Sequence, residues 1–132
     1  YRVPEELLEA AGIGLREAPG ALHAAEHAGI GVLPLFTICD RWDVGGVSTL
    51  HQADIGGPAI VVYDGYQGGA GVAELGYEAA ERHVRATAEL VAACGCAAGC
   101  PSCVQSPKCG NLNEPLSKDG AATLLARMLD AA

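Results

Sequence analysis

Residues 94–103 have the sequence CGCAAGCPSC, and one further cysteine, Cys109, follows six residues later. Five of the six cysteines in the 132-residue chain therefore fall within a span of 16 residues. A Cys-x-x-Cys pair such as Cys100 and Cys103 forms a tight turn whose two thiolates face one centre. The neighbouring glycines, alanines and prolines bury too little apolar surface to order this stretch without a metal. The pattern predicts a structural zinc site held by four thiolates.

The cluster offers one more cysteine than a zinc site needs. The five candidate ligands are Cys94, Cys96, Cys100, Cys103 and Cys109. We favour Cys96 and Cys109 beside the Cys-x-x-Cys pair, because Cys94 continues an apolar helix face that begins at Leu90. A disulfide framework and an iron–sulfur cluster are the alternatives. The absence of a visible signal peptide argues against disulfides, and nothing in the sequence resembles a redox partner site. We interpret the isolated Cys39 as a small buried apolar residue.

The rest of the chain has the apolar pattern of a helix-rich α+β domain with a few short strands. The ranges in which apolar residues recur with a helical period are 7–11, 19–27, 72–93 and 120–129. We expect the second of these helices to stop at Gly29. The β-branched run at 59–63 predicts a buried strand, and the sequence around 40–46 indicates an irregular polar turn.

Length and hydropathy predict a single domain that does not enter a membrane. We divide residues 1–132 into an α+β body (1–93), a zinc lobe (94–118) and a C-terminal helix (119–132). The longest apolar runs fall far short of the about 20 residues that span a bilayer. We therefore expect a soluble, monomeric, cytoplasmic protein. No Gly-Lys-Ser or Gly-Lys-Thr is present, so an ATP-binding P-loop is not part of this chain.

A second pattern, at His23, Glu26 and His27, matches the H-x-x-E-H sequence of inverted zinc peptidases. Two imidazoles one helical turn apart could hold a metal, and the glutamate could act as a general base. Such a site needs a third ligand, for which Glu74 or Glu78 is available. The alternative function is therefore a metallohydrolase, although short motifs on alanine-rich helices also arise by chance.

Four blocks of sequence resemble the C-terminal zinc-binding domain of MrfA-type helicases, the mitomycin repair factor A group. They are ALHAAEHA (21–28), CDRWDVGGVS (39–48), VYDGYQGGAG (62–71) and GCPSCVQSPKCGNLNEPLSK (99–118). The resemblance implies the end module of a superfamily 2 DEAD/DEAH-box helicase. Motors of this group hydrolyse ATP, move 3′ to 5′ on single-stranded DNA and act in DNA cross-link repair. The resemblance places the family's four zinc cysteines within the cluster and carries over no catalytic residue.

The charge distribution limits how this chain could meet DNA. The net charge is −8, and residues 1–93 carry all of it, whereas residues 94–132 are neutral. Counterion release by basic side chains supplies most of the affinity for nucleic acids, so the isolated chain should bind DNA weakly. The expected partners are the motor domains of the same parent chain and, through the parent, single-stranded DNA. The possible DNA contacts are Gln105, Lys108, Asn111 and Lys118.

Overall fold

The computed structural model describes residues 1–35, 44–52, 56–64, 79–101, 103–106, 109 and 113–130. The helices are α1 (Glu5–Ala10), α2 (Ala18–Val32), the 3-10 helix η1 (Leu33–Leu35), α4 (Ala80–Ala93) and α5 (Lys118–Asp130). The strands are β1 (Val44–Gln52) and β2 (Gly57–Asp64). The predicted helix-rich α+β class is confirmed. No helix in these ranges is long and apolar enough to cross a membrane.

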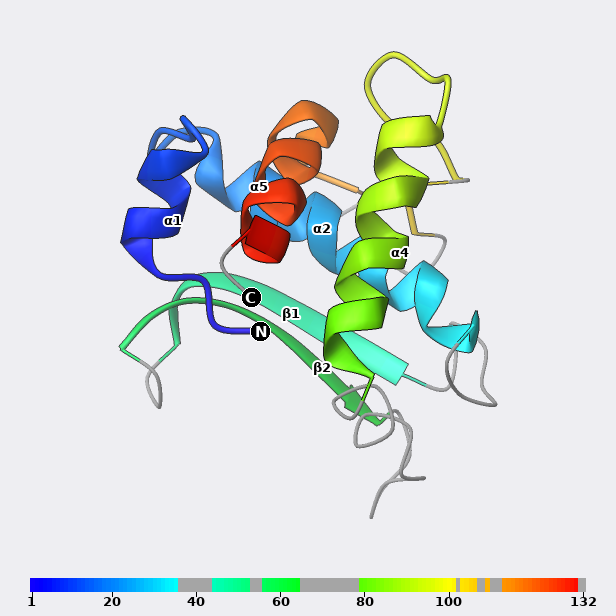
Figure 1. Cartoon of the computed structure of the whole chain (residues 1–132), viewed down its shortest axis with the longest axis horizontal. Helices are drawn as coiled ribbons and strands as arrows, with labels where there is room; N and C mark the ends of the chain where they lie inside the picture. The colour runs from blue at the N-terminus through cyan, green and yellow to red at the C-terminus, as the bar shows by residue number, and fades with distance from the viewer. Residues whose placement is uncertain are drawn as a thin grey trace.

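Helix α2 is the centre of the fold. It contacts α4 and α5 and also both strands, and the strands lie along one side of the helical layer (Figure 1). Its sequence is mostly alanine and glycine, so neighbouring elements approach its backbone closely. A Cβ added to Gly20 would lie 3.2 Å from the backbone nitrogen of Ser117, just before α5. One added to Gly120 would lie 2.8 Å from the Cβ of Ala21.

The two strands form an antiparallel pair that the N-terminal segment extends. β1 pairs with β2 in a register that sets Val47 opposite Val61, with an irregularity between Thr49 and Gln52. Beyond β2, the Val3 amide donates to the Pro58 carbonyl oxygen at 2.9 Å. The sheet is therefore covered by α2 on one face and continued at the β2 edge by the first residues of the chain.

Two elements differ from the sequence expectation. Helix α2 does not stop at Gly29 but runs on to Val32. Gly29 instead leaves room for the ring of His83 on α4, which packs against it. The Nε2 atom of His83 lies 2.7 Å from the Gly29 carbonyl oxygen. The predicted turn at 40–46 is wrong for residues 44–46, which begin β1. Helix α4 starts at Ala80, and residues 72–78 of the longer predicted helix lie outside the described residues.

Candidate metal centre

Four cysteine side chains converge just after α4. The ligand atoms of Cys94, Cys96, Cys100 and Cys103 all lie within 4.8 Å of one another. The Sγ–Sγ distances are 3.6 Å for Cys94–Cys96, 3.5 Å for Cys94–Cys100, 3.5 Å for Cys96–Cys103 and 3.8 Å for Cys100–Cys103. Four thiolates bound tetrahedrally to zinc at about 2.3 Å stand about 3.8 Å apart. The donor set and its spacing therefore fit a zinc ion.

The backbone brings these thiols together by two local devices. Helix α4 ends at Ala93, and the next residue, Cys94, turns the chain out of the helix with a ψ of 125°. The Cys100 carbonyl oxygen then accepts hydrogen bonds from the amides of Cys103, at 3.0 Å, and Gln105, at 3.1 Å. Gly99 precedes this turn with a φ of 131°, and a Cβ there would lie only 2.7 Å from Val104. Only glycine fits this position.

Lys118, at the start of α5, donates to the same cluster. Its Nζ lies 2.7 Å from the Cys94 carbonyl oxygen, 2.6 Å from that of Cys96 and 3.2 Å from the Cys96 sulfur. Burial alone would raise the pKa of the Cys96 thiol, but hydrogen bonds from Lys118 and the other thiols lower that pKa to about 6. Burial raises the pKa of the Cys103 thiol to about 12. Lys118 is thus buried beside the thiols, a position that does not favour the expected DNA contact.

Cys109, the fifth cysteine of the sequence cluster, lies apart from these four. Its sulfur is 3.5 Å from Nε2 of His23, and with His27 these residues form a second group of ligand atoms within 4.8 Å of one another. The geometry therefore favours Cys94 as the fourth thiol of the first cluster, in contrast to our preference for Cys109. The sequence had singled out both the histidine pair and a spare cysteine, but it gave no sign that they meet.

Of the other three expected DNA contacts, the structure describes one. Gln105 is half-buried, and its side-chain amide donates to the Gly99 carbonyl oxygen at 3.4 Å. Lys108 and Asn111 lie outside the described residues. On either side of that stretch, the Ser106 amide donates to the Asn113 side chain at 2.7 Å, and Asn113 Nδ2 donates back to the Ser106 carbonyl oxygen at 3.0 Å.

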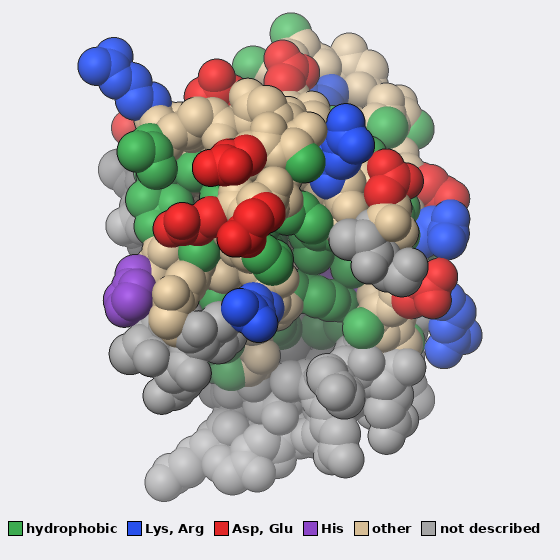
Figure 2. Space-filling model, turned by 60° about the vertical axis from the view of Figure 1, so that its left-hand side comes forward, with side chains coloured by type: hydrophobic (Ala, Val, Ile, Leu, Met, Phe, Trp, Pro, Cys, Tyr) green, Lys and Arg blue, Asp and Glu red, His purple; other side chains and the backbone are tan. Residues whose placement is uncertain are grey.

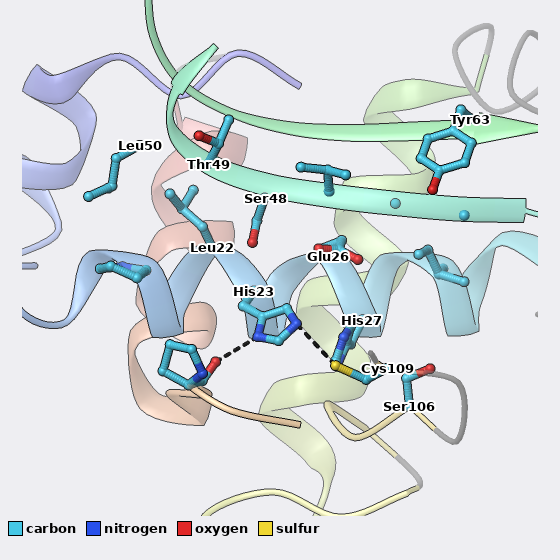
Figure 3. A pocket seen from close by; sticks show the side chains of 16 residues that line it. Leu22, His23, Glu26, His27, Ser48, Thr49, Leu50, Tyr63, Ser106 and Cys109 are labelled. Carbon is cyan, nitrogen blue, oxygen red and sulfur yellow. Dashed lines mark hydrogen bonds between the residues drawn. The ribbon is translucent and has the colours of Figure 1, made fainter. Parts of the chain in front are cut away.

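The hydrolase alternative loses its general base in this arrangement. Figure 3 shows His23 and His27 on the side of α2 that faces Cys109, whereas Glu26 lies on the side that faces β1. The Glu26 carboxylate packs so closely on Gly46 that a Cβ there would lie 2.8 Å from Oε2. Glu74 and Glu78, the expected third ligands, lie outside the described residues. The peptidase interpretation is not favoured.

Comparison with known proteins places residues 25–104 within a protein family described as the MrfA Zn-binding domain. An uncharacterised protein of Methanocaldococcus jannaschii, MJ1572.1, is 40% identical over 111 residues, which are 82% of this chain and 99% of that protein. This relative consists almost entirely of the matched domain.

Other similar proteins are far longer than this chain. The uncharacterised ATP-dependent helicase YprA of Bacillus subtilis is 40% identical over 73 residues, 55% of this chain and 10% of the helicase. The ATP-dependent helicase HRQ1 of Saccharomyces cerevisiae is 28% identical over 80% of this chain and 11% of its own length. A crystal structure of the DUF1998 helicase MrfA bound to DNA matches with a TM-score of 0.71 and 32% identity, over 88% of this chain and 15% of that one.

Proposed function

Because the chain belongs to the family of MrfA Zn-binding domains and binds zinc, we propose that Cys94, Cys96, Cys100 and Cys103 hold the ion. The convergence of their four sulfur atoms at spacings that suit tetrahedral zinc carries the proposal. The extent of the family match supports it, because the matched residues include all four cysteines and end before Cys109. The ion would act structurally, since four thiolates leave no open position for a substrate.

Paired cysteine variants test this assignment. Replacing Cys94 by serine should abolish zinc binding at the cluster and speed amide hydrogen exchange across residues 94–104. Cys109→Ser is the matched control, and it should keep the zinc at the cluster and leave exchange across residues 94–100, which hold three of the four thiols, unchanged. The opposite outcome, with residues 94–104 loosened by Cys109→Ser and unaffected by Cys94→Ser, would assign the fourth ligand to Cys109.

At the level of the whole protein, we propose that this domain is a non-catalytic part of an ATP-dependent 3′–5′ DNA helicase that acts in DNA repair. The helicase relatives and the DNA-bound MrfA structure support this context, while the chain itself spans about a tenth of those helicases. The domain would stabilise the motor and help to guide single-stranded DNA. The M. jannaschii relative consists almost entirely of the matched region, which supports a self-contained domain.

The surface charge indicates that DNA attraction must come from the motor domains. Figure 2 shows acidic and basic side chains interspersed on the face in view, without a continuous basic surface among the described residues there. With a net charge of −8, the isolated chain should bind DNA weakly and remain monomeric. Light scattering after size exclusion checks the monomer, and a salt-dependent DNA titration checks the weak binding.

Variants in the full-length parent test the guiding role. Lys108→Ala and Gln105→Ala should lower DNA-stimulated ATP hydrolysis and unwinding, and the loss caused by Lys108→Ala should shrink as the salt concentration rises, because salt weakens a lysine–phosphate contact. Arg85→Ala, on the exposed face of α4, is the matched control for removal of a surface charge. Unchanged unwinding by the Lys108 and Gln105 variants across salt concentrations would leave the domain with a structural role alone.

A further inference from the structure

The second group of ligand atoms lies where α2 meets the segment that contains Cys109, in a cavity that β1 also lines. His23 and His27 are one helical turn apart, with ring centroids 4.2 Å apart and an angle of 63° between the rings. Cys109 approaches them from a different part of the chain, 86 residues after His23, and its Sγ lies 3.5 Å from His23 Nε2 (Figure 3). All three residues are at least half-buried.

Both imidazole rings are oriented by backbone carbonyl groups. Nδ1 of His23 lies 2.7 Å from the Pro115 carbonyl oxygen, and Nδ1 of His27 lies 2.8 Å from that of Val104. A carbonyl oxygen only accepts hydrogen bonds, so each Nδ1 carries the ring proton when the ring is neutral. Nε2 is then the nitrogen with a lone pair for a metal. Metal-binding histidines are commonly held by such a bond from the other ring nitrogen, which fixes both the tautomer and the ring orientation.

We propose that His23, His27 and Cys109 form a second metal site, which binds a borderline-soft divalent ion such as Zn²⁺ through two nitrogens and one sulfur. A sulfur bound to zinc at about 2.3 Å and a nitrogen bound at about 2.0 Å stand about 3.5 Å apart in a tetrahedron. The 3.5 Å between Cys109 Sγ and His23 Nε2 agrees with that spacing. Binding converts the Cys109 thiol to a thiolate, and the released proton goes to solvent.

The fourth ligand of this site would come from solvent. The three side chains line a cavity of about 670 Å³ between α2, β1 and the segment that includes Ser106 and Pro115. A water molecule can reach an ion there, whereas the four-thiolate cluster is complete without one. Glu26 lines the same cavity, but its carboxylate packs against Gly46 of β1, on the side of α2 away from Cys109. The site therefore serves to tie α2 to the chain that follows the cysteine cluster.

The two sites are adjacent along the backbone, since His27 bonds the carbonyl group of Val104, the residue after Cys103. An ion at the second site would thus fix the end of the cysteine cluster against the helical core. Of the described histidines, His51 lies on β1 and belongs to neither group, so it provides a matched control.

Metal content after reconstitution tests the proposal. The chain is stripped of metal under reducing conditions, refilled with excess zinc, desalted and measured by mass spectrometry. We expect two zinc ions per chain in the wild type and in His51→Gln, and one in both Cys109→Ser and His23→Gln. X-ray absorption of the wild type should show imidazole as well as sulfur ligands, and the His23→Gln sample should show a weaker imidazole signal.

Two results would overturn the second site. One is a wild-type chain that holds a single zinc with sulfur ligands only. The other is a second zinc that persists in both Cys109→Ser and His23→Gln. The outcome is separate from that of the four-thiolate proposal, because Cys96→Ser should remove the cluster zinc and keep the imidazole-bound ion. If Cys109→Ser unfolds the chain around residue 109, the zinc content of His23→Gln still tests the second site.

Discussion

Helix α2 and the segment that follows α4 are stabilised in different ways. Nearly every side chain of α2 is buried, and its alanines and glycines let α5, α4 and the strands pack directly on its backbone. From residue 92 to residue 101, by contrast, no side chain is buried, although four thiols meet there or directly after it. The body therefore depends on close apolar packing, whereas the cysteine segment depends on the metal that its thiols bind.

Removal of zinc should separate the two regions most strongly. Structural zinc contributes about 10 kcal/mol or more to the folding of small zinc domains. A strong chelator should therefore lower the melting temperature and loosen residues 94–104, while the circular dichroism of the helices persists. Cys100→Ser and Cys103→Ser should reproduce this effect. An unchanged melting temperature in a verified metal-free sample would show that the cysteine segment does not depend on zinc.

A cavity in the helical body should destabilise the protein without affecting the zinc site. Leu124 on α5 is fully buried in the core with Ala21 and Leu22 of α2. Leu124→Ala should lower the free energy of unfolding by about 2 to 5 kcal/mol, with zinc content unchanged. Urea unfolding measures this, and Leu35→Ala is the control because Leu35 is 75% exposed. Equal losses from the two variants would show that the body does not depend on tight packing.

Lys118 joins the helical body to the cysteine segment, because it lies on α5 and its ammonium group donates hydrogen bonds to Cys94 and Cys96. Lys118→Met removes three hydrogen bonds to the cysteine segment and should weaken zinc binding by about 10- to 100-fold. Competition with a chromophoric chelator measures the affinity, and Lys118→Gln separates the charge from the hydrogen bonds.

The sign of the pH dependence follows from the same contact. The hydrogen bond to Cys96 raises the pKa of Lys118 above its usual 10.5. Its stabilising contribution is therefore fully present below 10.5 and is lost only as the pH rises through the higher folded-state value. Because the Lys118 contact also lowers the pKa of the Cys96 thiol to about 6, the difference in zinc affinity between the wild type and Lys118→Met should be larger at pH 7 than at pH 9. A difference of the same size at both pH values would contradict an effect of the ammonium group on the Cys96 thiol.

The smallest effect should come from the exposed surface of α4. Glu81 and Arg85 form an ion pair at 3.5 Å with both side chains more than half exposed. Glu81→Gln should change the free energy of unfolding by less than about 0.5 kcal/mol, with zinc affinity unaffected. Thermal melting at low and high salt measures it. A larger loss would mean that surface charge, rather than packing or metal, holds α4 in place.

The sequence predicted those elements whose signals are local. The period of the apolar residues located α2 and α5, the β-branched run at 59–63 located β2, and the dense cysteine spacing indicated a zinc site. β1 was missed because Gly45 and Gly46 look like a turn. These glycines serve close packing instead, since a Cβ on Gly45 would lie 2.6 Å from the Tyr63 ring.

The remaining features depend on contacts between distant parts of the chain. Cys109 looked like one member of a cysteine cluster, and its contact with a histidine 86 positions earlier arises only when α2 packs beside it. The sequence offered Lys118 as a possible DNA contact and gave no sign that its ammonium group reaches carbonyl oxygens 22 and 24 residues upstream. Patterns within a short window carry no information about such pairs.

The paired hydrogen bonds between Ser106 and Asn113 have a consequence for conformational entropy. They close an eight-residue loop that contains Cys109, with Asn113 in the left-handed region at a φ of 59°. Closing a flexible loop of this length costs about 2 kcal/mol. Because the closure forms with the fold, this entropy is lost before any ligand arrives. The contact of Cys109 with its partners therefore does not include this cost, and Asn113→Ala would transfer it to the binding step.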